Sequence, residues 1–130
     1  DVPGVANNLI GFSGELNVAA LQAESTAAAQ AAVDVLREST PPTQMLLTHR
    51  WMLSQALHTL TRRFIVDGSA DQARAAARET IQAYRDVAGT VDADVPGVAN
   101  NLIGFSGELN VAALQAESTA AAQAAHDLKA

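Results

Sequence analysis

The chain of 130 residues carries 14 acidic and 8 basic residues, for a formal net charge of −6, and it contains no cysteine. Proteins that hold nucleic acid usually show a basic patch or stripe, so this balance argues against a nucleic-acid partner. The absence of cysteine excludes disulfides, thiolate nucleophiles and thiolate metal ligands. No apolar run reaches the roughly 18 residues of a membrane span and no leader peptide is visible, so we expect no membrane partner and, by default, a cytoplasmic protein.

An internal repeat dominates the sequence. The segment DVPGVANNLIGFSGELNVAALQAESTAAAQAA, residues 1–32, recurs without a change as residues 94–125. The match ends where Val33 corresponds to His126, so the chain holds one unit of 93 residues and about a third of the next, a window cut from an array. Either a recent duplication or a deliberately copied segment accounts for the identity. In both cases the copies have not diverged, which argues against an active site private to one of them.

Alanine occupies 28 positions, whereas proline and glycine together occupy 12, and this composition favours helices. Alanine is the best intrinsic helix former and loses no side-chain entropy on folding. The sequence therefore predicts an all-α protein forming a single repeat domain.

The first hairpin is expected over residues 1–40. After Pro3 and Gly4, apolar residues recur with the period of an amphipathic helix at Val5, Leu9, Phe12 and Leu16. Two glycines inside this helix, Gly11 and Gly14, cost roughly 1 kcal/mol each relative to alanine. We expect them to permit close backbone approach, either between helices or to a ligand. A break at residues 22–25 leads into a second helix that ends near residue 38.

The second hairpin is expected over residues 41–89. Thr40 can cap its first helix, because Pro41 and Pro42 fit a first helical turn in which the missing N–H costs nothing. Gly68 is a natural left-handed terminator. Ser69, three residues before Gln72, predicts a capping box for the next helix. After a linker at residues 90–95, a third hairpin over residues 96–130 repeats the first, giving about six helices in three antiparallel hairpins.

The two hairpins of the unit also match each other when the sequence is shifted by 48 residues. The aligned pairs are Leu9 with Leu57, Phe12 with Leu60, Leu16 with Phe64, Ala29 with Ala77, Val33 with Ile81, and Leu36 with Tyr84. The duplication is therefore nested.

The run LHTLTRRFIVDGSADQARAAARETIQAYR, residues 57–85, resembles a tetratricopeptide repeat. It carries large residues at Leu57, Leu60 and Phe64, a glycine at Gly68, and small residues at Ala73, Ala77 and Thr80. The chain departs from that family at Thr61 and Ser13, where a glycine is common, at Arg85, where the closing proline is absent, and in its half-unit spacings of 48 and 45 residues. The resemblance implies an α-solenoid, a right-handed superhelix of antiparallel hairpins; a generic HEAT-like or other α-solenoid is the second choice.

If the resemblance holds, the first helix of each hairpin lines a concave groove that takes a protein or peptide ligand. The candidate groove residues are Asn7, Gly11, Gly14, Asn17, Gln55, His58, Arg62, Asn100 and Asn110. Asparagine and arginine can hydrogen-bond peptide carbonyls or carboxylates. The alternative for each residue is a solvated polar face without a ligand.

No pattern in the sequence indicates catalytic, cofactor or metal chemistry. The three histidines, His49, His58 and His126, are too far apart to share a helical turn and have no flanking carboxylate pair, so the first two are expected on helix surfaces. The GFSG motif at residues 11–14 lacks the lysine of a phosphate loop. Trp51 is expected to pack the third helix against the second, and Arg50, Arg62 and Arg63 are expected to pair with acidic residues of neighbouring helices.

These observations favour a non-enzymatic scaffold for protein–protein interaction. A first alternative is a structural or engineered repeat that stacks head to tail with itself or exchanges hairpins, because both termini carry the same segment. A second alternative is a sensor or regulatory fragment of a larger bacterial signalling protein. The last helix ends in HDLKA, where His126 and Lys129 replace Val33 and Leu36 of the first copy and make that end more polar.

Overall fold

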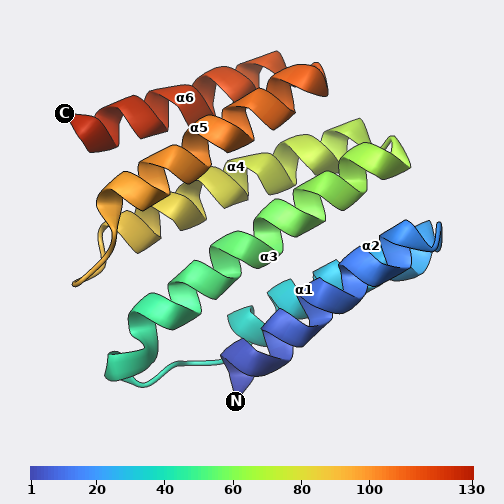
Figure 1. Cartoon of the computed structure of the whole chain (residues 1–130), viewed down its shortest axis with the longest axis horizontal. Helices are drawn as coiled ribbons and strands as arrows, with labels where there is room; N and C mark the ends of the chain where they lie inside the picture. Colours follow the sequence, from blue (N-terminus) through green and yellow to red (C-terminus); the bar gives the residue numbers. More distant parts are fainter.

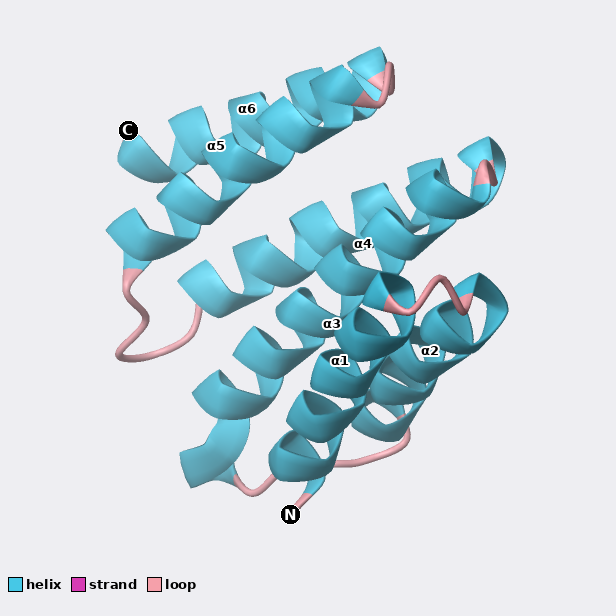
Figure 2. Ribbon diagram, turned by 45° about the vertical axis from the view of Figure 1, so that its right-hand side comes forward, coloured by secondary structure: helices cyan, strands magenta, loops and turns pink.

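The computed structural model describes residues 1–130 and is all-α, with six helices that pack as antiparallel neighbouring pairs (Figures 1 and 2). The helices are α1 (Val2–Val18), α2 (Gln22–Arg37), α3 (Leu46–Asp67), α4 (Ala70–Ala88), α5 (Val95–Val111) and α6 (Gln115–Lys129), with a 3₁₀ turn at Thr43–Met45. The predicted all-α class, helix number and pairing of neighbouring helices are confirmed, whereas the α-solenoid stays a prediction. None of the six helices combines the length and the apolar composition that crossing a membrane requires.

An aspartate begins both copies of the repeated hairpin. The side chain of Asp1 accepts a hydrogen bond from the Gly4 N–H at 2.6 Å, and Asp94 accepts from the Gly97 N–H at 3.0 Å. This cap satisfies a backbone donor that has no partner inside the helix. The helix therefore starts at Val2, before the proline and glycine, and the prediction that both residues precede it was wrong.

Helix ends follow the backbone geometry of particular residues. Gly68 ends α3 in the left-handed conformation, with φ of 75°, as predicted. The turns inside the first and third hairpins place Ala20 and Ala113 in the same region, both with φ of 62°, which no glycine marks in the sequence.

The predicted starts of α2 and α3 were wrong: α2 begins at Gln22, inside the break predicted at residues 22–25, and α3 begins later than predicted. α3 begins at Leu46 rather than after Thr40, because a residue that precedes proline disfavours helical torsion angles and Pro42 itself is extended, with ψ of 153°. Ser69 makes no side-chain hydrogen bond to the start of α4, so the capping box is absent, although α4 does begin at Ala70.

The second hairpin lies between the other two (Figure 1). Its first helix, α3, packs against α1 and α2, and its second helix, α4, packs against α5 and α6. Two apolar cores result. One joins the first and second hairpins around Leu36, Leu57 and Leu60, and the other joins the second and third hairpins around Tyr84 and Phe105.

A pair of serines clasps the two helices of each repeated hairpin. The Ser13 hydroxyl donates to the carbonyl of Ser25 at 2.7 Å, and the Ser25 hydroxyl donates to the carbonyl of Ser13 at 2.6 Å. Ser106 and Ser118 make the same reciprocal bonds, both at 2.8 Å. These small side chains bring the helices close.

The glycines of the repeated segment do not serve this close approach. A Cβ atom added at Gly11, Gly14, Gly104 or Gly107 would meet no atom within 4 Å. The prediction that they let helices approach each other was therefore wrong.

Candidate protein-interaction surface

A polar network crosses the junction between the second and third hairpins. The Gln55 amide donates to the Tyr84 hydroxyl at 3.2 Å, and that hydroxyl lies 2.8 Å from Nδ1 of His58. Nε2 of His58 lies 2.8 Å from Oε2 of Glu108, and Arg62 Nε donates to Oε1 of the same carboxylate at 2.6 Å. Four polar side chains of the second hairpin thus form a connected network that binds Glu108 of α5.

These contacts fix the tautomer of His58. A carboxylate accepts, so Nε2 of His58 carries the proton and donates it to Glu108. The Tyr84 hydroxyl, which accepts from Gln55, then donates to Nδ1. Both ring nitrogens of His58 and the Tyr84 hydroxyl are satisfied when His58 is neutral, whereas a protonated ring would aim a second N–H at a hydroxyl that already accepts one from Gln55.

The electrostatics agree with this assignment. Burial, helped by the charge of Arg62, lowers the pKa of His58 below its ordinary value of 6.5, although Glu108 opposes the shift. Burial raises the pKa of Tyr84 to about 12, so its hydroxyl keeps the proton that it donates. Burial by itself would raise the pKa of Glu108, but the hydrogen bond from Arg62 and the interactions with His58 outweigh it and lower that pKa.

We expect acid to loosen the third hairpin in two steps. The pKa values of His58 and Glu108 are both depressed in the folded state, so the unfolded chain binds more protons and stability falls as pH drops. The contribution of His58 is present above pH 6.5 and is lost below it; that of Glu108 follows below 4.5. Urea unfolding should show a lower midpoint at pH 5.5 than at pH 7.5, and the His58→Asn variant should lose this first step. An equal step in the variant would contradict the assignment.

A second ionic contact closes the other side of the junction. The side chain of Glu117 on α6 is 4% exposed and lies 3.2 Å from Nη2 of Arg78 and 4.0 Å from Nε of Arg74. The expectation that Arg50, Arg62 and Arg63 pair with acidic residues of neighbouring helices is confirmed for Arg62 and wrong for the other two. Arg50 donates to the Thr90 hydroxyl, and Nε and Nη1 of Arg63 have no hydrogen-bond partner.

Apolar side chains of the third hairpin fill the space between these two contacts. The ring of Phe105 lies edge-on to His58, with centroids 4.4 Å apart, and is 1% exposed. The buried residues that share this side of the hairpin are Val98, Leu102, Phe105, Leu109 and Leu114. The side of α5–α6 that docks on the second hairpin is therefore an apolar stripe flanked by Glu108 and Glu117.

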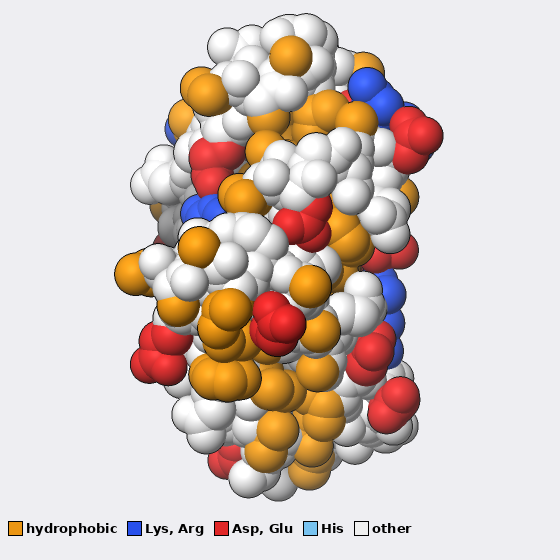
Figure 3. Space-filling view, turned by 90° about the vertical axis from the view of Figure 1, so that its right-hand side faces the viewer, with side chains coloured by type: hydrophobic (Ala, Val, Ile, Leu, Met, Phe, Trp, Pro, Cys, Tyr) orange, Lys and Arg blue, Asp and Glu red, His pale blue; other side chains and the backbone are white.

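The same stripe is more exposed on the first hairpin, where its residues are exposed or half-buried. We define the N-terminal face by Val5, Leu9, Phe12, Leu16 and Leu21, flanked by Glu15 and Glu24. Val5 is 48% and Phe12 is 51% exposed, whereas their copies Val98 and Phe105 are 2% and 1% exposed. Figure 3 shows hydrophobic side chains gathered over the lower part of the molecule, the part in which α1 and α2 lie.

The acidic residues of the N-terminal face also lack the partners of their copies. Neither Glu15 nor Glu24 forms an ion pair, whereas Glu108 and Glu117 each meet basic side chains of the second hairpin. One sequence thus presents the same apolar and acidic surface twice, once occupied and once free.

The predicted groove residues separate into two groups. Gln55, His58 and Arg62 are joined in the network around Tyr84 and Glu108. The others lie on α1 and α5 and make no hydrogen bond with those three: Asn7, Gly11, Asn100 and Asn110 are exposed, and Gly14 and Asn17 are half-buried. The groove itself stays a prediction.

Three residues lie elsewhere than the sequence suggested. His49 and His58 are buried, at 8% and 6% exposure, so their expected place on helix surfaces was wrong. Trp51 packs edge-on to Tyr84 of α4, with centroids 6.2 Å apart, and joins the core of the second and third hairpins rather than contacting α2 as predicted.

Sequence reasoning missed Tyr84 and Glu108 as junction residues. Tyr84 occupies the position of Leu36 in the 48-residue alignment, and a hydroxyl at a core position that needs a partner was the available signal. No such signal marked Glu108, because its copy Glu15 has the same neighbours in sequence and no partner.

A cleft of about 370 Å³ lies near this junction, between Trp51, Val87, Val98 and the loop residues Asp92 and Asp94. No group of three or more histidine, aspartate or glutamate residues is placed to hold a metal ion. Comparisons with protein-family models, with curated proteins and with solved structures found no match for this chain.

Proposed function

We propose that this chain is a non-enzymatic helical-repeat scaffold, an α-solenoid resembling the tetratricopeptide class, that binds a helical hairpin of another protein through its N-terminal face. The observation that carries the proposal is the contrast between Phe12 and Phe105, which belong to identical segments and differ in exposure by half of the side chain. Exposed apolar residues that form a contiguous stripe mark interaction sites more often than scattered ones do.

The occupied copy supports a specific kind of partner. On the second hairpin, the surface that receives α5–α6 combines small residues at Ala73 and Ala77 with Ile81 and Tyr84. Cationic side chains lie at its two margins, above Glu108 and Glu117. A partner for the N-terminal face would therefore present a helical hairpin with a small-residue and aromatic ridge, one cation to meet Glu15 and another to meet Glu24.

The concave groove remains a prediction with weaker support. Gln55, His58 and Arg62, which the resemblance places in the groove, already have partners inside the chain. A ligand that used them would have to break the network that seats α5. The N-terminal face needs no such rearrangement.

A variant of this chain that exposes the α3–α4 surface, here called the donor, tests the proposal. In the Phe12→Asp/Phe105→Asp double variant, the charge at Phe105 should release the third hairpin and uncover the matching surface of α3–α4, while the charge at Phe12 spoils its own N-terminal face. We expect this donor to form a one-to-one complex with fluorescently labelled wild-type chain, which fluorescence anisotropy would measure.

Two controls make the result specific. The labelled Phe12→Asp single variant should not bind the donor, because its N-terminal face carries the charge. Circular dichroism of the donor should retain the helicity of the first two hairpins. A folded donor with no affinity for the wild-type chain would contradict the proposed function.

A further inference from the structure

We infer that a second copy of this chain covers the N-terminal face, with the free side of α5–α6 of one molecule docking on α1 of the next. The inference rests on the proposed function, since it names the occupant of the same face. It requires a surface at the other end of the chain that is free, apolar and opposite in charge.

The third hairpin has such a surface. A groove of about 240 Å³ runs between α5 and α6 on the side that no helix covers, and we call its lining the C-terminal face: Ile103, Ser106, Ala122, Ala125, His126 and Lys129. In the first hairpin the copies of these residues include Ala29, Val33 and Leu36, which are buried against α3. The C-terminal face is therefore equivalent to the surface of the first hairpin on which α3 packs.

The helix that fills that surface in the first hairpin resembles α1. The residues of α3 that pack there are Leu57 and Leu60, with Phe64 beside them, and these fall on Leu9, Phe12 and Leu16 of α1 in the 48-residue alignment. The apolar stripe of α1 thus has the same spacing as the stripe of α3 that packs on the first hairpin. A second molecule can supply it without any element of the first molecule moving.

The residues at which the two faces differ from their aligned copies are complementary in charge. On the C-terminal face, His126 and Lys129 replace the apolar Val33 and Leu36. On α1, Glu15 replaces Arg63, whose Nε and Nη1 find no hydrogen-bond acceptor in α3. A junction between two molecules would therefore bring a carboxylate to a basic rim. Opposite charge at a rim favours one register and one partner.

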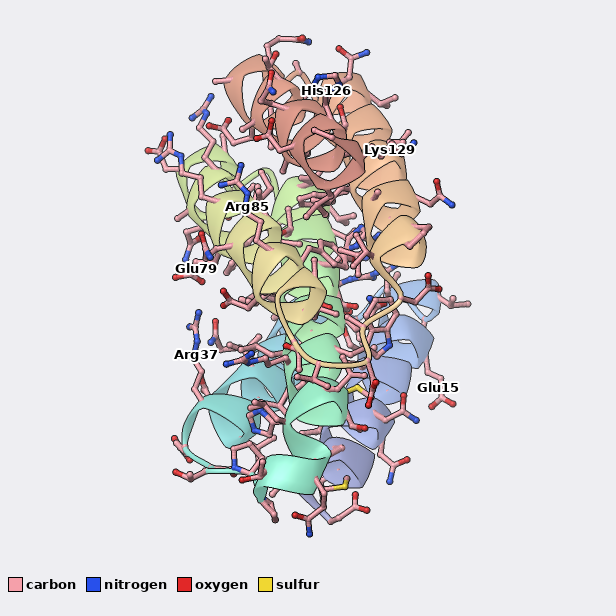
Figure 4. All side chains as sticks on the ribbon, turned by 90° about the vertical axis from the view of Figure 1, so that its left-hand side faces the viewer. Glu15, Arg37, Glu79, Arg85, His126 and Lys129 are labelled. Atoms are coloured by element: carbon pink, nitrogen blue, oxygen red, sulfur yellow. The ribbon has the colours of Figure 1, made fainter.

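Charge also decides between two ways of pairing the copies. Two N-terminal faces packed on each other would place Glu15 and Glu24 of both molecules together with no cation between them, which costs free energy. In Figure 4, Glu15 lies on α1 in the lower part of the molecule, whereas His126 and Lys129 lie at the top on α6. The arrangement is head to tail, and such heterologous contacts propagate into open chains.

Sedimentation equilibrium over a hundredfold concentration range is the first test. We expect the average mass of the wild-type chain to climb from 13.5 kDa without stopping at a dimer. Phe12→Asp should weaken association about a hundredfold, because a central aromatic side chain carries much of the binding free energy of an interface. Val18→Asp is the matched control, since Val18 and its copy Val111 are both 88% exposed and association should be unchanged.

Mixing two variants tests the direction of stacking. Phe12→Asp spoils the N-terminal face and leaves the C-terminal face intact, whereas Lys129→Glu does the reverse. At a concentration at which the wild type associates but a contact weakened about tenfold does not form, each variant alone should be largely monomeric, and the mixture should form a one-to-one dimer of twice the chain mass and no larger species. If Lys129→Glu alone dimerises as well as the wild type, the copies pair face to face and the inference is wrong.

A charge exchange completes the test. Glu15→Lys and Lys129→Glu should each weaken association about tenfold, and the double variant should recover most of the loss. A wild-type chain of 13.5 kDa at every concentration would overturn the inference. Adding Lys129→Glu to the donor chain removes its C-terminal face, so donor binding then reports on the proposed function alone and can succeed where self-association fails.

Discussion

Replacing Phe105 with alanine is expected to lower the free energy of unfolding by about 3 to 5 kcal/mol, whereas Phe12→Ala should cost less than about 1 kcal/mol. The two phenylalanines stand in identical segments of 32 residues, so helix propensity and local sequence cancel in the comparison. What differs is burial, because Phe105 fills the core beside His58 and Phe12 is half exposed. Urea unfolding followed by circular dichroism would measure both values.

Loss of the third hairpin should precede global unfolding in the Phe105→Ala variant. Arrays in which each hairpin contacts its neighbours can lose a terminal hairpin locally. Amide hydrogen exchange should therefore show lost protection in α5 and α6, with α1 to α3 little affected. Equal destabilisation by both substitutions would mean that the junction between the second and third hairpins contributes little to stability.

Glu108→Ala is expected to destabilise the chain by about 2 kcal/mol, whereas Glu15→Ala should stay within about 0.5 kcal/mol. Removing the Glu108 carboxylate leaves the N–H at Nε2 of His58 without an acceptor. It also removes the carboxylate that accepts two hydrogen bonds from Arg62. Glu15 has no such partners. The same denaturation experiment measures both substitutions.

A comparison of Arg62→Ala with Glu108→Ala separates the two bonds of Glu108. Arg62→Ala alone should cost less than Glu108→Ala, because Arg62 is about half exposed and its ion pair is screened by water. The difference between the two single variants then reports on the buried bond to His58. If Arg62→Ala lowers the free energy of unfolding as much as Glu108→Ala does, the hydrogen bond between His58 and Glu108 contributes nothing to stability.

Much of the helical framework could be predicted from the sequence because it depends on local chemistry. The period of Val5, Leu9, Phe12 and Leu16 identifies the first helix, and Gly68 sets the end of α3 through a torsion angle that glycine adopts without strain. Local chemistry also explains the errors at helix starts. Thr40 precedes two prolines, the second of which is extended, and the Ser69 hydroxyl makes no hydrogen bond to the helix N–H groups.

The candidate surface could not be predicted because its meaning depends on distant partners. Phe12 and Phe105 have the same neighbours in sequence, so no local rule could assign one to solvent and the other to the core. His58 looked like a surface residue because its two partners lie 26 and 50 residues further along the chain. The repeat itself was the available clue, since it says that two equal surfaces exist.

The serine clasp has a consequence for the speed of assembly. Four hydroxyl-to-carbonyl bonds hold the first and third hairpins in the same closed shape, although the two hairpins pack on opposite sides of the second. Such a preformed unit does not have to fold as it binds, so its encounter with a partner resembles that of two rigid bodies, with association rates of about 10⁵ to 10⁷ M⁻¹s⁻¹. Differences in affinity among variants of the N-terminal face should then appear as differences in residence time.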